Sequence, residues 1–478
     1  MKMQVLTSVK KKSQMKNKYL DLIDQTFDFP QPEFQLNDGG LKFHGIDLNK
    51  LVQKYGTPLK FSFLPAIGDK IDLCRDWFAN AFEENNYDGN YHYSYCTKSS
   101  HFDFVLKECL KRKVNIETSS AIDLDIIISL FNKGLLEDDI YVLCNGYKTE
   151  EYISKMAQLI ELGFNRIIPI IDSIHEFEML DEMINTELQI GIRIASEEDP
   201  KFEFYTSRLG IGYKDIVPFY NWKIKGHKKF KVTLLHFFVN TGIRDNAYYW
   251  NELRKFINVY TDLIKADAPI KHLDIGGGFP IKNSLAFNFD YQYMITEIIA
   301  QIKSGAVSVG ADHPNIFTEF GSFTVAESGG TIFSILNQKK QNDKERWNMI
   351  DGSFMTTLPD TWAINKRFIM LPINRWNDKY ERVFLGGMTC DSDDYYNSEQ
   401  HINAIYLPEF KPEKPLHIGF FNTGAYQESI SGYGGLKHCL IPAPKHIIID
   451  RDENGELTDS VYRQEQTSQE MLQILGYA

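Results

Sequence analysis

The stretch NYHYSYCTKSSHFDFVLKECLKR, residues 90–112, contains one complete strand-then-helix unit. Its first half is an apolar, aromatic run that ends in small and polar residues, as a buried parallel strand does. In its second half apolar residues recur near i, i+3, i+4 and i+7, which is the spacing of an amphipathic helix. We therefore predict a strand that is followed directly by a helix.

The same alternation continues from residue 57 to residue 278. Further strands are predicted for TPLKFSFL, VNIETSS, DIYVLCNG, RIIPIID, LQIGIRIA, KVTLLHFFVN and KHLDIGGG, at residues 57–64, 114–120, 139–146, 166–172, 188–195, 231–240 and 271–278. Amphipathic segments such as 149–163 and 247–265 lie between them. Eight such units favour a closed (β/α)8 TIM barrel over an open sheet.

The residue pattern of the sequence changes after about residue 320. Short β-rich runs such as RFIMLPIN (367–374) and KHIIID (445–450) alternate there with Gly, Pro and Asp turns, which favours an antiparallel β-sandwich or β-barrel domain. FQLNDGGLKFHGID (34–47) has the same residue pattern. The predicted parts are a disordered basic N-terminus, a segment that contributes to the β domain, the barrel and the C-terminal β domain, at residues 1–20, 21–54, 55–318 and 319–478.

Length and charge limit the classes of function. A chain of 478 residues and 55.3 kDa is too long for one ordinary core. Its 64 acids and 52 bases give a net charge of −12, which argues against a nucleic-acid or anionic-membrane partner and suits a cationic small molecule, although acids also simply solvate a surface. No window approaches the roughly 18 uninterrupted apolar residues of a membrane span.

The six cysteines are too scattered for a disulfide framework, and no CxxC pair indicates a structural zinc site. The first 18 residues carry six lysines and no acid, and their apolar stretch is too short for a signal-peptide core. We therefore expect a cytoplasmic protein, with Met15 as a second candidate start.

Lys98 lies at the end of a run that is otherwise too apolar for a surface lysine. Burial at the end of a barrel strand lowers the pKa of a lysine and makes it a Schiff-base nucleophile. The structural alternative is a lysine that extends its charge out of the strand end to water.

LDIGGGFP, residues 273–280, is an apolar strand that runs into Gly276, Gly277 and Gly278. Successive glycines let backbone N–H groups close around a phosphate. Pro280 and the spacing disfavour a dinucleotide site, and a plain tight turn remains the alternative.

Two further residues end apolar runs of the predicted barrel. Glu319 follows the run NIF, where a carboxylate could hydrogen-bond a pyridinium nitrogen, although an N-cap or an ion pair is the simpler interpretation. His236 ends another predicted strand, a position where a histidine is more often part of the core.

GMTCDSDDYY, residues 387–396, places Cys390 beside Asp391, Asp393 and Asp394. Carboxylates beside a thiol suit a cationic substrate and a proton donor, but they also occur in solvated turns. Asp360, in TTLPDTW, is an acid in an aromatic setting, where its charge needs a partner.

In combination these motifs resemble the group IV pyridoxal-phosphate-dependent amino-acid decarboxylases, which have the alanine-racemase-type fold. The resemblance runs from about Leu41 to Asp450 through YSYCTKSS, VNIETSS, IRIA, LDIGGGFP, TEFGS, GMTCDSDD and GAYQES. It implies pyridoxal 5'-phosphate as cofactor and a homodimer whose active sites are shared across the interface. The cofactor contacts that it implies are Lys98, Glu117, Arg193, His236, Phe238, Thr241, Gly276, Gly277, Gly278, Glu319, Gly321 and Tyr426.

The same resemblance implies the chemistry. Lys98 and Cys390 match the family's Schiff-base lysine and proton donor. The runs TTLPDTWAI, TCDSDD and IGFFNTGAYQE are most similar to biosynthetic arginine decarboxylases, which make agmatine and carbon dioxide for polyamine synthesis. The substrate ligands implied by that likeness are Asp360, Asp391 and Asp394.

Three departures from the family pattern concern the cofactor geometry. The ring-stacking histidine falls at Phe238, with His236 two residues earlier, and a phosphate-contacting arginine is replaced by Ser322. The small residue before the lysine is Thr97, which follows Cys96.

Alternatives of the same fold remain open. Ornithine or lysine could replace arginine, because one acid can hold an amine or a guanidinium, whereas diaminopimelate would need a positive clamp. A racemase would need a second base. A non-catalytic regulator would be expected to lose Lys98 or Glu319, both of which are retained.

Overall fold

Eight parallel strands close into a barrel in the computed structural model of the chain, which describes residues 32–197, 205–343, 345–396 and 405–477. The predicted basic extension at 1–20 and the candidate start Met15 lie outside these ranges. Pairing follows the order β9, β11, β12, β13, β5, β6, β7, β8, and β8 pairs back with β9. The bounds are β5 Tyr91–Cys96, β6 Asn115–Thr118, β7 Val142–Cys144, β8 Ile167–Ile171, β9 Leu188–Ala195, β11 Phe230–His236, β12 His272–Asp274 and β13 Asn315–Phe320, and the short β10 Ile211–Gly212 pairs with β9.

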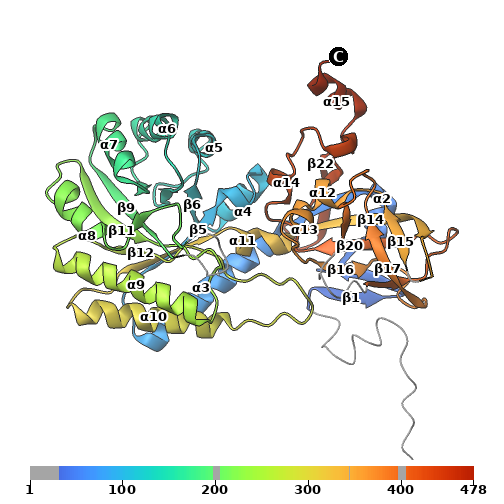
Figure 1. Ribbon diagram of the computed structural model, residues 1–478, viewed down its shortest axis with the longest axis horizontal. Helices are drawn as coiled ribbons and strands as arrows, with labels where there is room; N and C mark the ends of the chain where they lie inside the picture. Colours follow the sequence, from blue (N-terminus) through green and yellow to red (C-terminus); the bar gives the residue numbers. More distant parts are fainter. Residues whose placement is uncertain (1–31, 198–204, 344, 397–404, 478) are drawn as a thin grey trace, which may run out of the picture.

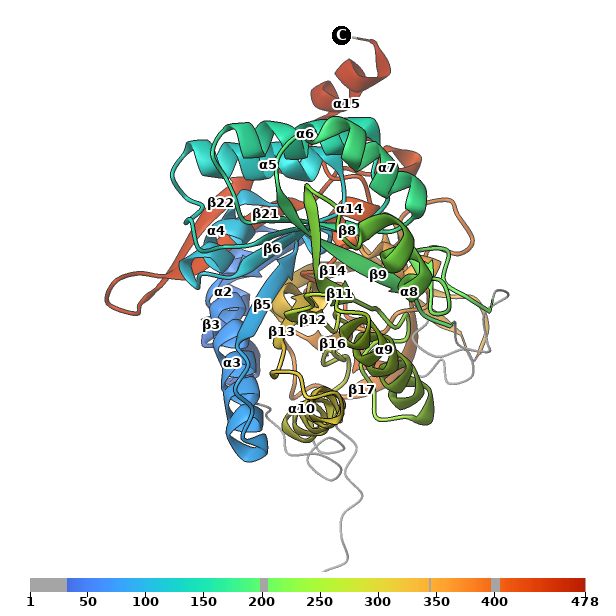
Figure 2. The ribbon, with the colours of Figure 1, turned by 90° about the vertical axis from the view of Figure 1, so that its left-hand side faces the viewer.

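Helices surround these strands (Figure 2). They are α3 Pro65–Asn85, α4 Asp103–Lys111, α5 Ala121–Asn132, α6 Glu150–Glu161, α7 Ile174–Met183, α8 Ile216–Phe219, α9 Ala247–Lys265 and α10 Tyr291–Ser308. Several of these helices begin with an N-cap side chain that accepts a hydrogen bond from the backbone N–H three residues later. These N-cap residues are Ser120, Thr149, Ser173, Asn246 and Asp290. Such caps fix where each helix begins, and so where the loop from the preceding strand must end.

A second, ten-stranded sheet lies beside the barrel (Figure 1). Its strands are β4 Leu59–Phe63, β14 Gly329–Lys340, β15 Arg346–Ile350, β16 Ile369–Pro372, β17 Tyr380–Gly386, β18 Tyr395–Tyr396, β19 Ile405–Pro408, β20 His417–Phe421, β21 Lys445–Arg451 and β22 Leu457–Arg463. Helices of this part are α11 Ser322–Val325, α12 Phe354–Thr357, α13 Pro359–Ala363, α14 Gln427–Ile430 and α15 Ser468–Leu475. The sheet is mixed rather than purely antiparallel, because β15 pairs with β17 and β4 pairs with β21 in parallel.

The predicted fold class, a (β/α)8 barrel with a β domain, is confirmed, but one strand was assigned to the wrong sheet. TPLKFSFL forms β4, which pairs with β14 and β21 of the second sheet and buries Phe61 and Phe63 in that sheet's core. The eighth barrel strand is instead β13, which runs to Phe320, past the expected barrel end at residue 318. An apolar run of this length fits either sheet, and only the pairing partners decide between them.

The N-terminal β-rich segment forms a small sheet of its own. Strands β1 Phe34–Asn37, β2 Gly40–Phe43 and β3 Ile46–Asp47 pair only with one another among the described strands, and α2 Leu48–Tyr55 follows. Phe34 and Phe43 pack against Phe421 of β20, and the Leu41 N–H donates to the Ile373 carbonyl. This sheet therefore covers the β domain. None of the helices in the described ranges combines the length and apolar character that crossing a membrane requires.

Candidate active site

A cavity of about 390 Å³ opens at the carboxyl ends of the barrel strands, next to the β domain. This is the size of an ordinary small-molecule site, at the end of a barrel where catalytic residues collect. Tyr426, from the β domain, lines it together with barrel residues, and its N–H donates to the Ser99 carbonyl. The lining residues are Cys96, Lys98, Asn145, Arg193, Leu209, His236, Phe238, Gly277, Gly278, Phe279, Glu319, Gly321, Ser322, Phe323 and Tyr426.

Lys98 follows β5 and faces this cavity with 42% of its side chain exposed. Its Nζ lies 2.6 Å from Glu117 Oε2, on the neighbouring strand β6. Burial lowers the pKa of Lys98, but the acidic groups Cys96, Glu117 and Glu319 outweigh burial and hold it well above its usual range. The expected lowered pKa is therefore wrong for this chain. Burial raises the pKa of Glu117 to about 7 against the opposing charge of Lys98.

Glu319, on β13, is held by two polar side chains from other strands. His236 Nε2, at the end of β11, lies 3.1 Å from Glu319 Oε2, and Asn145 Nδ2 donates to both carboxylate oxygens at 3.2 and 3.3 Å. Burial opposes charge on Glu319, yet His236, Lys98 and Arg193 lower its pKa to about 2. Burial also lowers the pKa of His236, against the charge of Glu319, which raises it.

Asn145 and Asp274 are site residues that the sequence analysis did not single out. Asn145 also accepts a bond from Arg193 Nη1 at 3.4 Å, so it links Arg193 to Glu319. Asp274 ends β12, and its Oδ1 accepts the Gly276 N–H at 2.9 Å, which fixes the start of the glycine turn. Burial and the charge of Glu319 raise the pKa of Asp274 well above its usual range. Asn145 directly follows β7 and Asp274 ends β12, and this position at the carboxyl end of a barrel strand was the available signal.

The glycines of LDIGGGFP form a turn that passes over Glu319. A Cβ at Gly277 would collide with the Glu319 carbonyl oxygen, and one at Gly278 would meet the Gly242 backbone. The Glu319 N–H donates to the Gly276 carbonyl at 2.8 Å. The turn therefore has room for hydrogen but for no side chain at these positions.

The acids of the β domain are arranged differently from the expectation. Asp394 is 4% exposed, and its carboxylate accepts N–H groups of Phe354, Met355 and Thr389 and the Thr389 hydroxyl. Four donors of its own chain thus occupy the Asp394 carboxylate, and its role as a substrate ligand stays a prediction. Asp360 is also buried, and its Oδ2 accepts bonds from Lys366 and Gln427, each at 2.8 Å.

Cys390 and Asp391 lie in the loop that follows β17. Cys390 is exposed and Asp391 is half-buried, and within the described ranges neither lines the barrel cavity of its own chain. Most of the predicted barrel residues thus line one cavity, and the 390–394 loop does not. Glu117, Thr241 and Gly276 are not among the lining residues, although Glu117 contacts Lys98.

Comparison with known proteins identifies the family. Residues 77–326 match the family described as "Pyridoxal-dependent decarboxylase, pyridoxal binding domain", which covers more than half of the 478 residues. The chain belongs to the pyridoxal-dependent decarboxylases. Its relatives include biosynthetic arginine decarboxylases of Prochlorococcus marinus (strain MIT 9215), 24% identical over 91% of this chain and 85% of the relative, and of Bacteroides thetaiotaomicron, 23% identical over 90% and 86%.

Solved structures show the same fold for this decarboxylase. The biosynthetic arginine decarboxylase of Campylobacter jejuni superposes with a TM-score of 0.77 at 20% identity, covering 93% of this chain and 89% of the other. A diaminopimelate decarboxylase of M. jannaschii superposes with a TM-score of 0.74 at 18% identity, covering 92% and 97%.

The cavity of the decarboxylase fits pyridoxal phosphate. It offers the Lys98 amine on one wall and the ionised Glu319 carboxylate on another. The buried hydroxyls of Ser99, which lies against Gly321, and of Thr241, which precedes Gly242 of the glycine-turn contact, have no hydrogen-bond partner within the described chain. A phosphate would supply the missing acceptors, and backbone N–H groups beside Gly277 and Gly321 can approach it without side chains in between.

Phe238 and His236 differ in their exposure to the cavity. Phe238 lines the cavity, whereas His236 is fully buried and occupied with Glu319. Phe238 lines the cavity together with the aromatic residues Phe279, Phe323 and Tyr426, and its contact with a cofactor ring stays a prediction.

Proposed function

We propose that the protein decarboxylates L-arginine to agmatine and carbon dioxide, with pyridoxal 5'-phosphate as cofactor, as a step of polyamine biosynthesis. The observation that carries this proposal is that Lys98 and Glu319 line the same barrel cavity. The relatives that match about 90% of the chain are named biosynthetic arginine decarboxylases.

Each barrel residue then has a defined task. Pyridoxal phosphate supplies an electron sink for the pair of electrons that the departing carboxylate leaves behind. Lys98 would hold the cofactor, and Glu117, whose Oε2 lies 2.6 Å from the Lys98 Nζ, would accept or return the lysine proton. Glu319, supported by the hydrogen bonds from His236 and Asn145, would hold a proton at the pyridine nitrogen. The glycine turn, Gly321, Thr241 and Tyr426 would bind the phosphate.

The proton that replaces the carboxylate comes, in this proposal, from the thiol of Cys390 in a second copy of the chain. The loop that carries Cys390 is exposed and lies outside its own barrel cavity, so it is available to complete the site of another subunit. This arrangement requires a homodimer with shared active sites.

Asp391 is the proposed ligand of the guanidinium group. It is next to Cys390 in the chain and only half-buried, so its carboxylate can meet a substrate. Asp360 contributes a second acid whose charge is partly neutralised by Lys366. Holding the cationic end while an acid-rich site disfavours the substrate carboxylate favours its loss as carbon dioxide.

The test uses purified protein loaded with pyridoxal phosphate, with Lys98→Ala as the variant and Lys107→Ala as the matched control. Lys107 is an exposed lysine on α4 that pairs only with Asp103 among the described residues. Borohydride reduction should fix the cofactor on the peptide containing Lys98 in wild type and in the control, and both should release carbon dioxide from arginine. Labelling of a different lysine, or labelling in Lys98→Ala, would contradict the proposal.

A further inference from the structure

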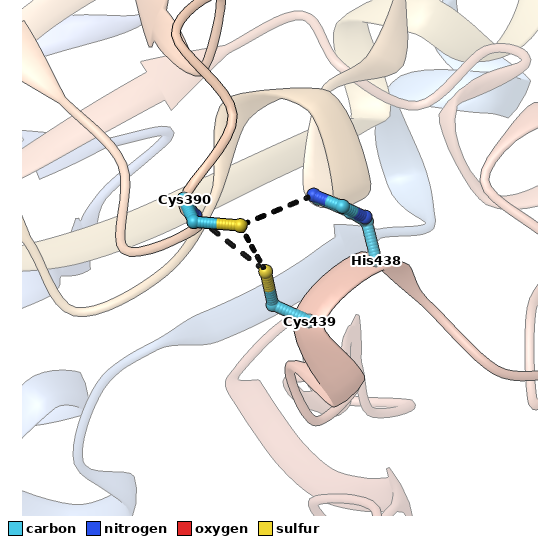
Figure 3. Close-up of side chains that lie close together, drawn as sticks. All are labelled: Cys390, His438 and Cys439. Atoms are coloured by element: carbon cyan, nitrogen blue, oxygen red, sulfur yellow. Dashed lines mark hydrogen bonds between the residues drawn. The ribbon is translucent and has the colours of Figure 1, made fainter.

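A cluster of two cysteines and a histidine lies on the surface of the β domain (Figure 3). Cys390 comes from the loop after β17, and His438 and Cys439 from the one-turn helix His438–Leu440. The Cys390 Sγ lies 3.3 Å from Cys439 Sγ and 3.9 Å from His438 Nε2, and the three ligand atoms lie within 4.8 Å of one another. All three residues are exposed.

These separations match the edges of a zinc coordination tetrahedron. With Zn–S bonds of about 2.3 Å and Zn–N bonds of about 2.0 Å, tetrahedral angles place two sulfurs about 3.8 Å apart and a sulfur and a nitrogen about 3.5 Å apart. The observed sulfur–sulfur and sulfur–nitrogen distances of 3.3 and 3.9 Å differ from those edges by less than the reach of a side-chain rotation. One ion can therefore contact all three groups with little movement of the chain.

The backbone of the segment carrying His438 and Cys439 is held in an uncommon conformation. Cys439 and Leu440 have φ of +54° and +51°, in the left-handed region that non-glycine residues avoid. The Cys390 N–H also points to Cys439 Sγ, at 3.5 Å. Strained backbone that persists marks a segment whose surroundings hold it in place, often at a functional site. Here it presents two donor side chains toward Cys390.

We propose that Cys390, His438 and Cys439 bind a thiophilic divalent metal ion, with Zn²⁺ as the best-matched example. Two thiolates and an imidazole form a donor set that zinc prefers, and the fourth position stays open to water. Binding displaces the two thiol protons to solvent and leaves the oxidation state of sulfur and metal unchanged.

The consequence for activity rests on the proposed function. If Cys390 delivers the proton to the substrate, a metal ion that holds its sulfur as a thiolate removes that donor. The metal site is then an inhibitory site that operates at the catalytic thiol, outside the cofactor cavity of its own chain. A simple disulfide between the cysteines is the competing outcome, but it needs an oxidant and gives His438 no part.

The experiment measures Zn²⁺ binding to the cofactor-loaded protein in competition with a chromophoric chelator. Wild type is compared with His438→Ala and Cys439→Ser, and with His175→Ala as the matched control, since His175 is an exposed histidine on α7 of the barrel. We expect one tight site per chain, release of about two protons per ion at neutral pH, and no change in His175→Ala. Affinity should fall at least about 10- to 100-fold in the two cluster variants, because loss of a mere supporting contact already costs that much.

Arginine decarboxylation is measured in the same titration. Activity of wild type should fall as the site fills and return with a chelator, and Cys439→Ser should need correspondingly more Zn²⁺. Equal Zn²⁺ affinity in wild type and Cys439→Ser overturns the metal site. A second result also overturns it. If wild type and His438→Ala bind Zn²⁺ equally and two free thiols are lost until dithiothreitol restores them, the cysteines form a disulfide. Full activity with the site filled overturns its inhibitory role. A protein that binds Zn²⁺ as described but never decarboxylates arginine refutes the proposed function and keeps the metal site.

Discussion

Glu176→Gln removes the charged half of an ion pair that has no exposed surface. Glu176, near the start of α7, and Lys148, in the loop after β7, are both 0% exposed, and the charged atoms lie 3.4 Å apart. The Glu176 carboxylate also accepts the backbone N–H groups of Lys148 and Asp172, at 2.8 and 2.9 Å. This pair anchors the loop that carries Asn145, and so supports the contact between Asn145 and Glu319.

The expected loss of unfolding free energy in Glu176→Gln follows from the burial of the ion pair. Removing one partner of a buried pair costs about 3–5 kcal/mol, because the remaining charge is left without compensation. Lys148 Nζ keeps only the Gly146 carbonyl, at 2.8 Å, among the partners that the structure shows. Burial already lowers the pKa of Lys148, against the charge of Glu176 that raises it. Glutamine retains one acceptor oxygen, so we expect a loss near the lower limit, about 3 kcal/mol, which is about 100-fold in the unfolding equilibrium.

The assay is urea unfolding followed by tryptophan fluorescence, with Glu178→Gln as the control. Glu178 lies on the same helix, is 48% exposed, and pairs with Lys223 at 2.8 Å, so its loss should cost about 0–1 kcal/mol. The helix propensities of Glu and Gln are similar and cancel in the comparison. Stabilities of the two variants within 1 kcal/mol of each other would refute the reasoning.

Three further predictions test other parts of the account. Gly277→Ala should weaken pyridoxal phosphate binding at least about tenfold in equilibrium dialysis, because its Cβ meets the Glu319 carbonyl. The control Gly226→Ala, with open space around its Cβ, should cost about 1–2 kcal/mol of stability and leave the affinity unchanged. Equal affinities in the two variants would contradict a role of the glycine turn in cofactor binding. His446 has a pKa lowered by burial from 6.5 to about 4, so the unfolded chain binds a proton that the folded chain does not, and stability should fall by up to about 3 kcal/mol as the pH drops from about 6.5 to 4. His446→Gln should flatten that slope in unfolding titrations, and an unchanged slope would exclude His446 as its source. Asp394→Asn should lower stability by about 1.5–3 kcal/mol, as loss of hydrogen bonds to a charged group does, while Asp391→Asn should raise the KM for arginine with stability unchanged; the reverse pattern in unfolding and steady-state assays would identify Asp394 as the substrate ligand.

Sequence alone pointed to polar residues at the carboxyl ends of barrel strands. Lys98, His236 and Glu319 each follow or end an apolar run, and the closed barrel brings such ends together at one edge. The same rule applied to Asn145 and Asp274, but an amide and a lone acid after a strand carry too little chemical signal to stand out.

Other features depend on contacts between distant segments. Phe61 of β4 is as buried as a residue of a barrel strand. Only the pairing of β4 with β14 and β21 places this strand in the second sheet. Asp394 could not be separated from Asp391 by sequence, because the N–H groups of Phe354 and Met355 that occupy it lie about forty residues earlier. The contact between Cys390 and Cys439 likewise brings together two segments that are far apart in the sequence and share no short motif.

The central claim is the substrate, and the most direct measurement is kcat/KM of the purified, cofactor-loaded protein for arginine, ornithine, lysine and diaminopimelate, read as carbon dioxide release with the amine product identified by mass. We expect the highest value for arginine, with agmatine as product. A higher value for ornithine or for either of the other two amino acids would contradict it.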